Sequence, residues 1–444
     1  MEAGLPPPPL TRRAVFAQSW PIMVGQASIP LVGLVDTVVI GRTGNVAALA
    51  GVALGAVVIN LVLWSFGFLR MGMTGLTAQA EGAGNRREVE ALLLRGLIAG
   101  FGIGALILLL HYPLALLAFS LLAGGAEVTG EAHLYVGACF LGAPAALAVF
   151  AITGWLFGLG RSRAALVLQL VMNLANIGLS TWLVCGLHLG AHGVGLAAAG
   201  AQWAALAAGL AIVTRVAGAD LLALARRAGI ATLFERAALA RLFAVNRDLM
   251  IRTIALLLLL TWFANAGARL GTVALAANQV LMQFVNIAAF ILDAFAFTAE
   301  ARVGNAIGAG SRAQFLRAVR LTGEYSLGCG ALMAVGFWLA GDALIAAITS
   351  DPELRQRAAL YLPFAALVPL AGMPSWLLDG IFIGATRGHA LRNAAVAATV
   401  IYVALDLALR PWGAAGLWTA FLLSYILRAL TLSAGLPGLL KSLR

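Results

Sequence analysis

Long apolar stretches separated by short polar breaks run through the whole chain. Each stretch can hold the roughly 20 predominantly apolar residues that a helix needs to cross a bilayer. The apolar residues are continuous rather than alternating, and a lone span must satisfy its own backbone, so we expect helices and not strands. The predicted spans lie at 14–38, 46–76, 90–112, 131–157, 164–186, 194–216, 243–265, 272–302, 315–341, 356–382, 391–408 and 413–435.

From the first span to the eleventh, the second half of the pattern repeats the first at an offset of 226 residues. One gap between the fifth and sixth spans of each half brings Gly195-Leu196 onto Gly416-Leu417. Leu49 falls on Leu275, and the loop Gly82-Ala83-Gly84-Asn85-Arg86 falls on Gly308-Ala309-Gly310-Ser311-Arg312. A constant offset across both loops and spans indicates two copies of one six-span unit, which is an architecture of membrane transporters.

This repeat predicts the fold class and the domains. Because each unit has an even number of spans, both copies enter the membrane in the same direction. We therefore predict an all-α integral membrane protein, with twelve transmembrane helices in two parallel six-helix lobes and a pseudo-twofold axis along the membrane normal. The predicted parts are a first lobe at 1–216, a cytoplasmic linker at 217–242 and a second lobe at 243–444.

Composition and charge agree with a membrane location. Hydrophobic residues make up 62% of the chain and charged residues 11%, against about 45–50% and about 25% in typical soluble domains. The net charge of +11 could suggest nucleic acid, but the basic residues follow the loops. With a cytoplasmic N-terminus, 22 of the 29 Lys and Arg fall inside and five outside. This asymmetry favours cytoplasmic termini in a bacterial-type inner membrane, with no nucleic-acid partner.

Metal sites and enzyme chemistry are not indicated. Cys139, Cys185 and Cys329 are scattered within apolar segments, so we expect neither disulfides nor a metal site. An intramembrane enzyme such as a polyprenyl transferase would need an Asp-x-x-x-Asp pair for Mg²⁺. None of the 18 acidic residues forms one. We expect no enzyme activity and no cofactor.

Asp36 in the first span is the main candidate for function, because an acid within the bilayer costs about 2.5–3.5 kcal/mol on insertion scales. No basic residue lies within its helical turn. An unpaired carboxylate in low dielectric can bind and release a proton near neutral pH. Pro21 and Pro30 permit a kink in the same helix that could change with protonation. We predict that Asp36 couples transport to protons; the alternative is a solvated residue, or one paired with Arg42.

The fifth span carries a row of polar residues, Asn173, Asn176 and Ser180. Their spacings of three and four place them on one helical face. They could hydrogen-bond Asp36 or coordinate a cation, and the alternative is polar helix packing. Tyr135 in the fourth span is a further candidate for the same cluster.

The second half carries acids of its own. Asp293 and Glu300, seven residues apart, face one side of the eighth span and form a candidate polar network with Asp379. Their alternatives are structural: a pair of Glu300 with Arg302 or Arg252, and a helix-end or interface role for Asp379.

Two other acids of the second half have a basic residue four positions away, so ion pairs are expected. Glu324 follows Arg320, which predicts an intrahelical pair. Asp406 precedes Arg410, which predicts a pair at the surface.

Three runs carry a more specific signal: Asn246-Arg-Asp-Leu-Met-Ile-Arg252-Thr, Leu292-Asp293-Ala-Phe and Leu378-Asp379-Gly-Ile-Phe-Ile-Gly384-Ala-Thr. With Asp36-Thr in the first span, they resemble the DinF branch of the multidrug and toxic compound extrusion transporters, within the MOP flippase superfamily. The resemblance implies two six-helix lobes around a central cavity that opens alternately to either side. It also implies export of amphipathic, often cationic compounds, driven by ion entry.

The resemblance also implies residue roles. The family's protonated first-span Asp matches Asp36, its kinking proline matches Pro21, and its fourth-span Tyr matches Tyr135. Its fifth-span Asn matches Asn176, preceded by Asn173. Many members have an Asp four residues after that Asn, where this chain has Ser180, and this departure weakens a sodium site.

We therefore expect a proton-coupled antiporter that exports small amphipathic compounds and acts as a monomer. Sodium coupling stays open. A lipid-linked precursor flippase of the same superfamily is the other alternative, but it should have a strongly cationic cavity. The 22 basic residues assigned to the inside and the five assigned to the outside leave only Arg70 and Arg252 within the spans.

Overall fold

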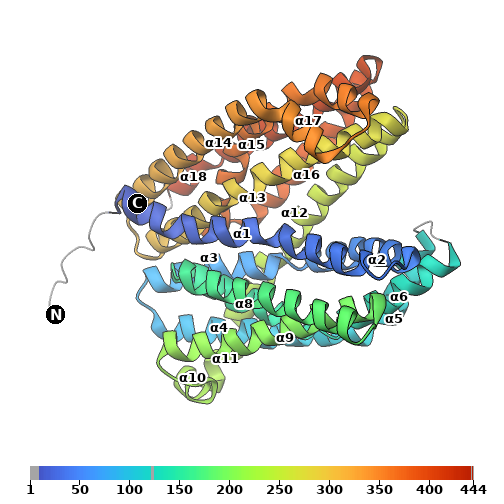
Figure 1. Cartoon of the computed structure of the whole chain (residues 1–444). Helices are drawn as coiled ribbons and strands as arrows, with labels where there is room; N and C mark the ends of the chain where they lie inside the picture. The colour runs from blue at the N-terminus through green and yellow to red at the C-terminus, as the bar shows by residue number, and fades with distance from the viewer. Residues whose placement is uncertain (1–9, 122–124, 442, 444) are drawn as a thin grey trace. The chain divides into compact units, whose positions relative to one another are not determined.

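A computed structural model describes residues 10–121, 125–441 and 443, and this part of the chain is helical with no strand. The predicted cytoplasmic ends, residues 1–9 and Arg444, lie outside the described residues. The first half forms α1 (Arg12–Gly41), α2 (Val46–Ser65), α3 (Phe68–Gly82), α4 (Arg86–Leu109), α5 (His111–Leu121), α6 (Ala126–Phe140), α7 (Ala143–Gly158), α8 (Ser162–Ser180), the π-helix η1 (Thr181–Gly186) and α9 (Gly190–Ala217) (Figure 1).

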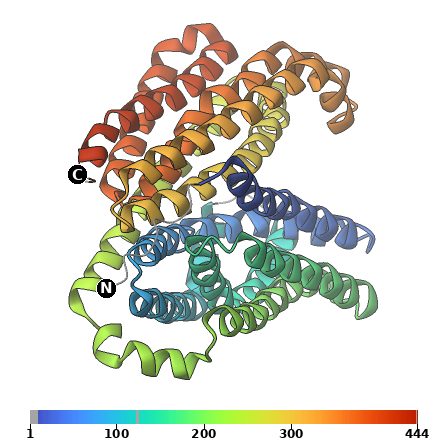
Figure 2. The ribbon, with the colours of Figure 1, turned by 90° about the vertical axis from the view of Figure 1, so that its left-hand side faces the viewer.

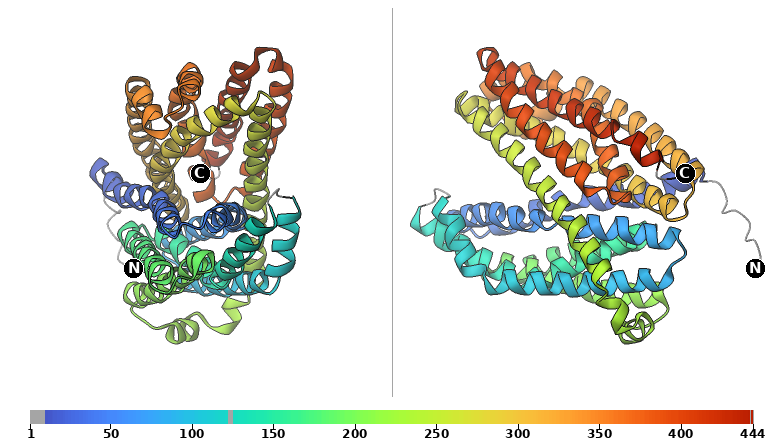
Figure 3. Two further views of the ribbon diagram at one scale, coloured as in Figure 1. Left: turned by 45° about the vertical axis from the view of Figure 1, so that its right-hand side comes forward. Right: turned by 180° about the vertical axis from the view of Figure 1, so that it is seen from behind.

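A short connector leads into the second half (Figure 2). It consists of α10 (Leu221–Ala228) and α11 (Ile230–Leu233). The last residues of the predicted linker, from Arg236 onward, form the start of a long helix, seen from behind in Figure 3. The second half forms α12 (Arg236–Ala268), α13 (Thr272–Gly308), α14 (Arg312–Ile348), α15 (Pro352–Gly384), α16 (Gly388–Leu409), the 3₁₀ turn η2 (Arg410–Trp412), α17 (Gly413–Ser433) and α18 (Leu436–Lys441).

The described residues hold ten helical stretches long and apolar enough to cross a membrane. The pair α6 and α7, bent by 51°, makes an eleventh. The last stretch, Gly388–Lys441, contains both α16 and α17. Each of the twelve predicted spans therefore has a helical counterpart, and the all-α membrane fold is confirmed.

From α2 to the start of α8, most outer helix boundaries of the first half recur 226 residues later in the second half, and an N-cap recurs with them. The side chain of Asn85 accepts a hydrogen bond from the Glu88 N–H (3.1 Å) at the start of α4. The side chain of Ser311 accepts one from the Gln314 N–H (3.3 Å) at the start of α14. Such caps satisfy amide groups that the first helical turn leaves unpaired. The repeat therefore extends to local structure as well as to the amino-acid sequence.

The halves differ in the continuity of their helices. The first half breaks between α2 and α3, between α4 and α5, and between α6 and α7, whereas α13, α14 and α15 are unbroken. At the α6–α7 break, a Cβ on Gly142 would lie 2.8 Å from the Cα of Ala199 on α9. Only a glycine lets α9 approach the bend so closely.

By their contacts, the residues form two units, and α1 belongs to both. Its residues up to Met23 pack with Gly82–Gly84 and Ala244–Arg444. Its residues from Val24 onward pack with the rest of the first half. The first part of α1 is thus a piece of the unit built mainly from the second half.

Specific contacts hold this first part of α1. The hydroxyls of Ser19 and Thr298 form a buried hydrogen bond (2.8 Å). The Glu324 carboxylate binds Arg12 (2.9 Å, Nη2 to Oε2) and Arg320 (2.9 Å, Nε to Oε1). The expected pair of Arg320 with Glu324 is confirmed, and Arg12 adds a link from α1.

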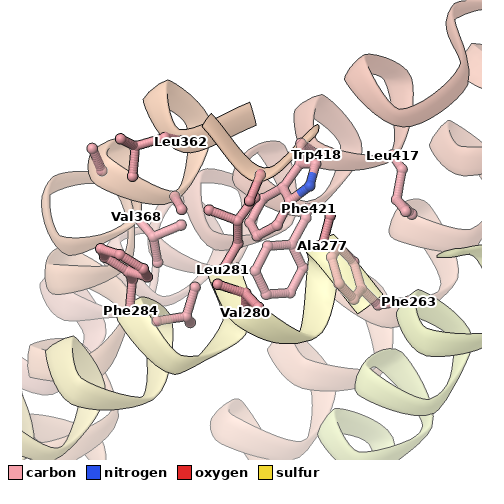
Figure 4. Packing of buried hydrophobic residues seen from close by; sticks show 14 of the residues in the cluster. Phe263, Ala277, Val280, Leu281, Phe284, Leu362, Val368, Leu417, Trp418 and Phe421 are labelled. Carbon is pink, nitrogen blue, oxygen red and sulfur yellow. The ribbon is translucent and has the colours of Figure 1, made fainter. Parts of the chain in front are cut away.

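An aromatic cluster forms the core of the second half (Figure 4). The ring centroid of Phe263 lies 5.1 Å from that of Trp418 and 4.8 Å from that of Phe421. Trp418 is fully buried and donates its indole N–H to Asn278 Oδ1 (3.0 Å). In lipid, packing and such polar contacts are what hold helices together.

Replacing Phe421 with Ala should destabilise this core by about 3–5 kcal/mol, because the fully buried ring leaves a cavity between three helices. Unfolding of the purified protein in detergent measures the change. Leu339→Ala on α14, where 79% of the side chain is exposed, is the matched control and should change stability little. Equal losses in the two variants would contradict the packing.

Candidate functional site

The second part of α1 places Asp36 against α8. Asp36 is 9% exposed, whereas Leu34 is 60% and Val38 is 46% exposed on the other faces of the helix. The amphipathic arrangement is therefore the reverse of that in a soluble helix: the apolar side chains face outward and the acid faces the interior of its unit.

Ser180 on α8 is the partner of this acid. Its hydroxyl donates a hydrogen bond to Asp36 Oδ1 (2.6 Å), and Ser180 is fully buried. Asp36 takes part in none of the ion pairs among the described residues, so the alternative pair with Arg42 is not formed there. The π-helix η1 begins directly after Ser180. Such widened turns are frequent at functional sites.

Asn173, two turns before Ser180 on α8, also connects α8 to α1. Its amide Nδ2 donates to Ser28 Oγ (2.7 Å), and its Oδ1 accepts from Gln169 Nε2 (2.9 Å). Both ends of the Asn173 amide are thereby occupied. The sequence indicated the face of α8 but not the partner Ser28, while the spacing of four to Gln169 was a readable signal.

Asn176 lies between the other two polar residues of α8 and is 5% exposed. Its Oδ1 is buried and has no hydrogen-bond partner among the described residues. Such an oxygen costs free energy unless something binds to it. Its position one turn from Ser180 makes it an acceptor that a ligand can use.

Tyr135 on α6 belongs to the same unit and is 7% exposed. Its hydroxyl is hydrogen-bonded to the thiol of Cys139, one turn later on α6. Both groups lie within electrostatic range of Asp36. The structure thus places Ser180 and Tyr135 near the buried carboxylate of Asp36.

Pro21 lies elsewhere on α1, which continues as an α-helix through both of its prolines. Pro21 is buried, and it stands two residues before Met23, the last residue of α1 that packs with the second half. The missing hydrogen bond at Pro21 therefore lies next to the point where the helix changes its packing partners.

The candidate network of the second half is an ion-paired cluster. The Asp379 carboxylate binds the guanidinium groups of Arg252 and Arg428, the latter at 3.0 Å. Asp293 and Asp379 both lie within electrostatic range of Tyr425, and Glu300 is fully buried on α13. The sequence indicated these acids but missed Arg428, because its place in the charge pattern suggested a cytoplasmic residue.

The expected surface pair of Asp406 with Arg410 is wrong. Asp406 is only 4% exposed, and its Oδ2 accepts hydrogen bonds from Trp262 Nε1 (2.8 Å) and Arg269 Nη2 (2.9 Å). The four-residue spacing is outweighed because α12 supplies the Trp262 indole, and the turn directly after α12 supplies the Arg269 guanidinium, at the buried carboxylate. No local pattern in the sequence reveals partners so far away.

The acids of the spans therefore differ in kind. Asp379 and Asp406 are neutralised by arginines, whereas Asp36 has a neutral hydroxyl donor. Among the described residues no three His, Cys, Asp or Glu side chains come together as a metal site. A carboxylate of the Asp36 kind is suited to reversible protonation.

This chain is similar to known proteins in sequence and in fold. The family model MatE matches residues 21–182 and 236–407, once in each half. DNA damage-inducible protein F of Escherichia coli (strain K12) is 38% identical over 428 residues, or 95% of this chain and 91% of that protein. A probable multidrug resistance protein NorM of Aromatoleum aromaticum is 30% identical, over 92% and 86%. The crystal structure of the Vibrio cholerae MATE transporter VcmN in the bent form matches with a TM-score of 0.85 at 20% identity, over 97% of each chain, which shows the fold.

The difference between the acids predicts their reactivity. Dicyclohexylcarbodiimide is apolar and modifies carboxylic acids in their protonated form, so at neutral pH it should label Asp36 and spare Asp379, which is ion-paired. Peptide mass spectrometry of the labelled protein measures both sites. Asp36→Asn should abolish the label at that position, and equal labelling of the two acids would contradict the assignment.

Proposed function

Because the chain belongs to the MatE family of membrane transporters, we propose that it is a secondary active exporter of amphipathic, often cationic compounds, driven by the entry of protons. It is a transporter and not an enzyme. The printed name of the NorM relative, a probable multidrug resistance protein, supports a broad set of small substrates. We place the protein in a bacterial inner membrane, as a monomer with both termini in the cytoplasm.

One observation carries the proton coupling. Asp36 is a buried carboxylate whose hydrogen-bond donor is the neutral Ser180 and not a cation. A membrane-embedded acid of this kind is costly to keep charged, so a proton or a substrate cation is its natural partner. Tyr135 and Asn176 provide further polar groups near the same place.

The exchange follows from competition for this carboxylate. When Asp36 is deprotonated, its charge favours a cationic compound at the first lobe. A proton that enters from outside neutralises the charge, and the compound loses its electrostatic attraction and leaves. The protein then returns and releases the proton to the cytoplasm. Coupling arises because proton and substrate cannot both be held well by one carboxylate.

The composition of the site favours protons over sodium. Sodium requires several oxygen ligands and gains from more than one negative charge, as hard cations do. Here Asp36 is the one carboxylate of the cluster, and Ser180 turns its hydrogen toward it. Both ends of the Asn173 amide are engaged elsewhere, which leaves the Asn176 oxygen.

Pro21 is the proposed hinge. The helix changes its packing partners two residues after this proline, and the Ser19–Thr298 hydrogen bond anchors the segment before it. A proline lowers the resistance of a helix to bending because one backbone hydrogen bond is missing. Protonation of Asp36 can therefore be relayed as a change of bend in α1.

Efflux of a cationic dye from proteoliposomes tests the coupling. An imposed proton gradient should drive efflux in the wild type and fail to do so in Asp36→Asn, because the variant has no titratable group at that position. An imposed sodium gradient should drive none. The Asp36→Asn side chain can still accept the hydrogen bond of Ser180, so the variant should keep its fold.

Other outcomes have clear meanings. Sodium-driven efflux that survives in Asp36→Asn would refute proton coupling through this residue and move it to the acids of the second half. Absence of dye efflux under either gradient, with flipping of a fluorescent lipid-linked precursor in its place, would support the flippase alternative.

Replacing Pro21 with Ala should restore the backbone hydrogen bond, stiffen α1 and lower the rate of proton-driven efflux while dye binding is retained. Pro30→Ala, at a second proline of the same helix that lies within the packing of a single unit, is the matched control and should have a smaller effect. Rates and affinities measured separately, by efflux and by dye fluorescence, decide between them. Equal effects would remove Pro21 from the role of hinge.

A further inference from the structure

The helix contact that carries Asp36 occurs twice in the chain. The offset of 226 residues brings Asp36 onto Trp262 and Ser180 onto Asp406. In one unit Ser180 donates to Asp36, and in the other the Trp262 indole donates to Asp406 (2.8 Å). The first and fifth helices of each repeat are therefore joined at the same point by a hydrogen bond to a carboxylate, which comes from the first helix in one copy and from the fifth in the other.

The surroundings of the contact repeat as well. Asn173 corresponds to Thr399, whose hydroxyl donates to the Ala255 carbonyl on α12 (2.9 Å), as Asn173 donates to α1. Asn176 corresponds to Tyr402. Tyr402 is fully buried, and its hydroxyl has no hydrogen-bond partner among the described residues, as is true of Asn176 Oδ1. The second half thus holds a polar cluster of the same plan.

The decisive difference between the two clusters is one arginine. Arg269 contacts Asp406 Oδ2 at 2.9 Å and lies 5.6 Å from the centroid of the Trp262 ring. The corresponding residue of the first repeat is Thr43, in the turn directly after α1, whose hydroxyl donates to the Ile40 carbonyl at the end of that helix. Asp406 has a fixed counter-ion, whereas Asp36, the acid of the other cluster, has none among the described residues.

We propose that Asp406 is a second carboxylate of the fold that could bind a proton, and that Arg269 prevents this by keeping Asp406 charged. The protein therefore couples transport to a single acid. The coupling part rests on the proposed function; the protonation part does not. A guanidinium at hydrogen-bond distance stabilises the ionised carboxylate, and its removal leaves a buried charge that takes up a proton. Arg269 is a positioning residue that acts through Asp406.

The other groups around Asp406 do not replace this counter-ion. Trp262 offers a neutral N–H, and Tyr402 lies within electrostatic range of both Asp406 and Arg269. Arg410, one turn further along, forms no ion pair among the described residues. Among the described residues, Asp379 on α15 and Arg428 on α17 are ion-paired with each other and not with Asp406 or Arg269. Arg269 is thus the cation whose loss should convert Asp406.

Carbodiimide labelling tests the inference without transport. In Arg269→Gln, Asp406 should gain label at neutral pH to a level similar to Asp36, while in the wild type it stays at background. Arg410→Gln removes the same charge from the same end of α16 and should leave Asp406 unlabelled. Arg269→Lys retains a cation and should also protect it. Labelling of Asp406 in the wild type, or none in a folded Arg269→Gln, would overturn the inference.

A double variant guards against misfolding. Arg269→Gln with Asp406→Asn removes both charges and should be more stable in detergent than Arg269→Gln alone, because no buried charge is left uncompensated. An additive loss of stability would show that the pair is not coupled and would count against the inference.

Transport separates this inference from the function on which it partly rests. The number of protons exchanged per dye should rise in Arg269→Gln, and the rise should vanish in the double variant. If Asp36→Asn leaves proton-driven efflux intact, the proposed coupling site fails, but labelling of Asp406 still decides whether Arg269 controls its charge. A gain of label with an unchanged proton count would reject only the link to coupling.

Discussion

The cost of a charge inside a bilayer is the constraint on which this structure depends. Three acids of the spans meet this cost in different ways. Asp379 is paired with two arginines, and Asp406 with one arginine and an indole, whereas Asp36 has a serine hydroxyl. The first two solutions hold the charge in place. The third leaves the carboxylate dependent on a mobile partner, which is what a transporter requires of a coupling group.

The internal repeat separates geometry from chemistry. Helix boundaries, N-caps and the hydrogen bond between the first and fifth helices recur in both halves. Packing determines these features, and substitutions that keep the shape of the helices leave them unchanged. Single side chains such as Arg269 and Thr43 then give equivalent positions different electrostatics. In our proposal, the carboxylate of one copy binds and releases a proton, and that of the other copy stays charged.

The first helix has a particular place in this arrangement. Its beginning is held by Glu324 and Thr298 of the second half, and its remainder carries Asp36 and packs with the first half. A change in charge at Asp36 therefore acts on a helix whose other end is anchored among different residues. Pro21 lies at this transition, where a missing backbone hydrogen bond makes bending least costly.

The sequence alone determined the helices, the repeat, the polar face of α8 and the acid of α1, because hydropathy, helical period and a constant offset are local or linear signals. It did not reveal which arginine meets which acid. The spacing of four residues correctly predicted the pair of Arg320 with Glu324 but wrongly predicted the pair of Arg410 with Asp406. The partners of Asp406 and Asp379 lie far away in the sequence, at a separation of 137 residues for Arg269 and 127 for Arg252. Only tertiary packing brings such groups within reach, since the strength of a buried ion pair depends on distance and desolvation and not on spacing along the chain.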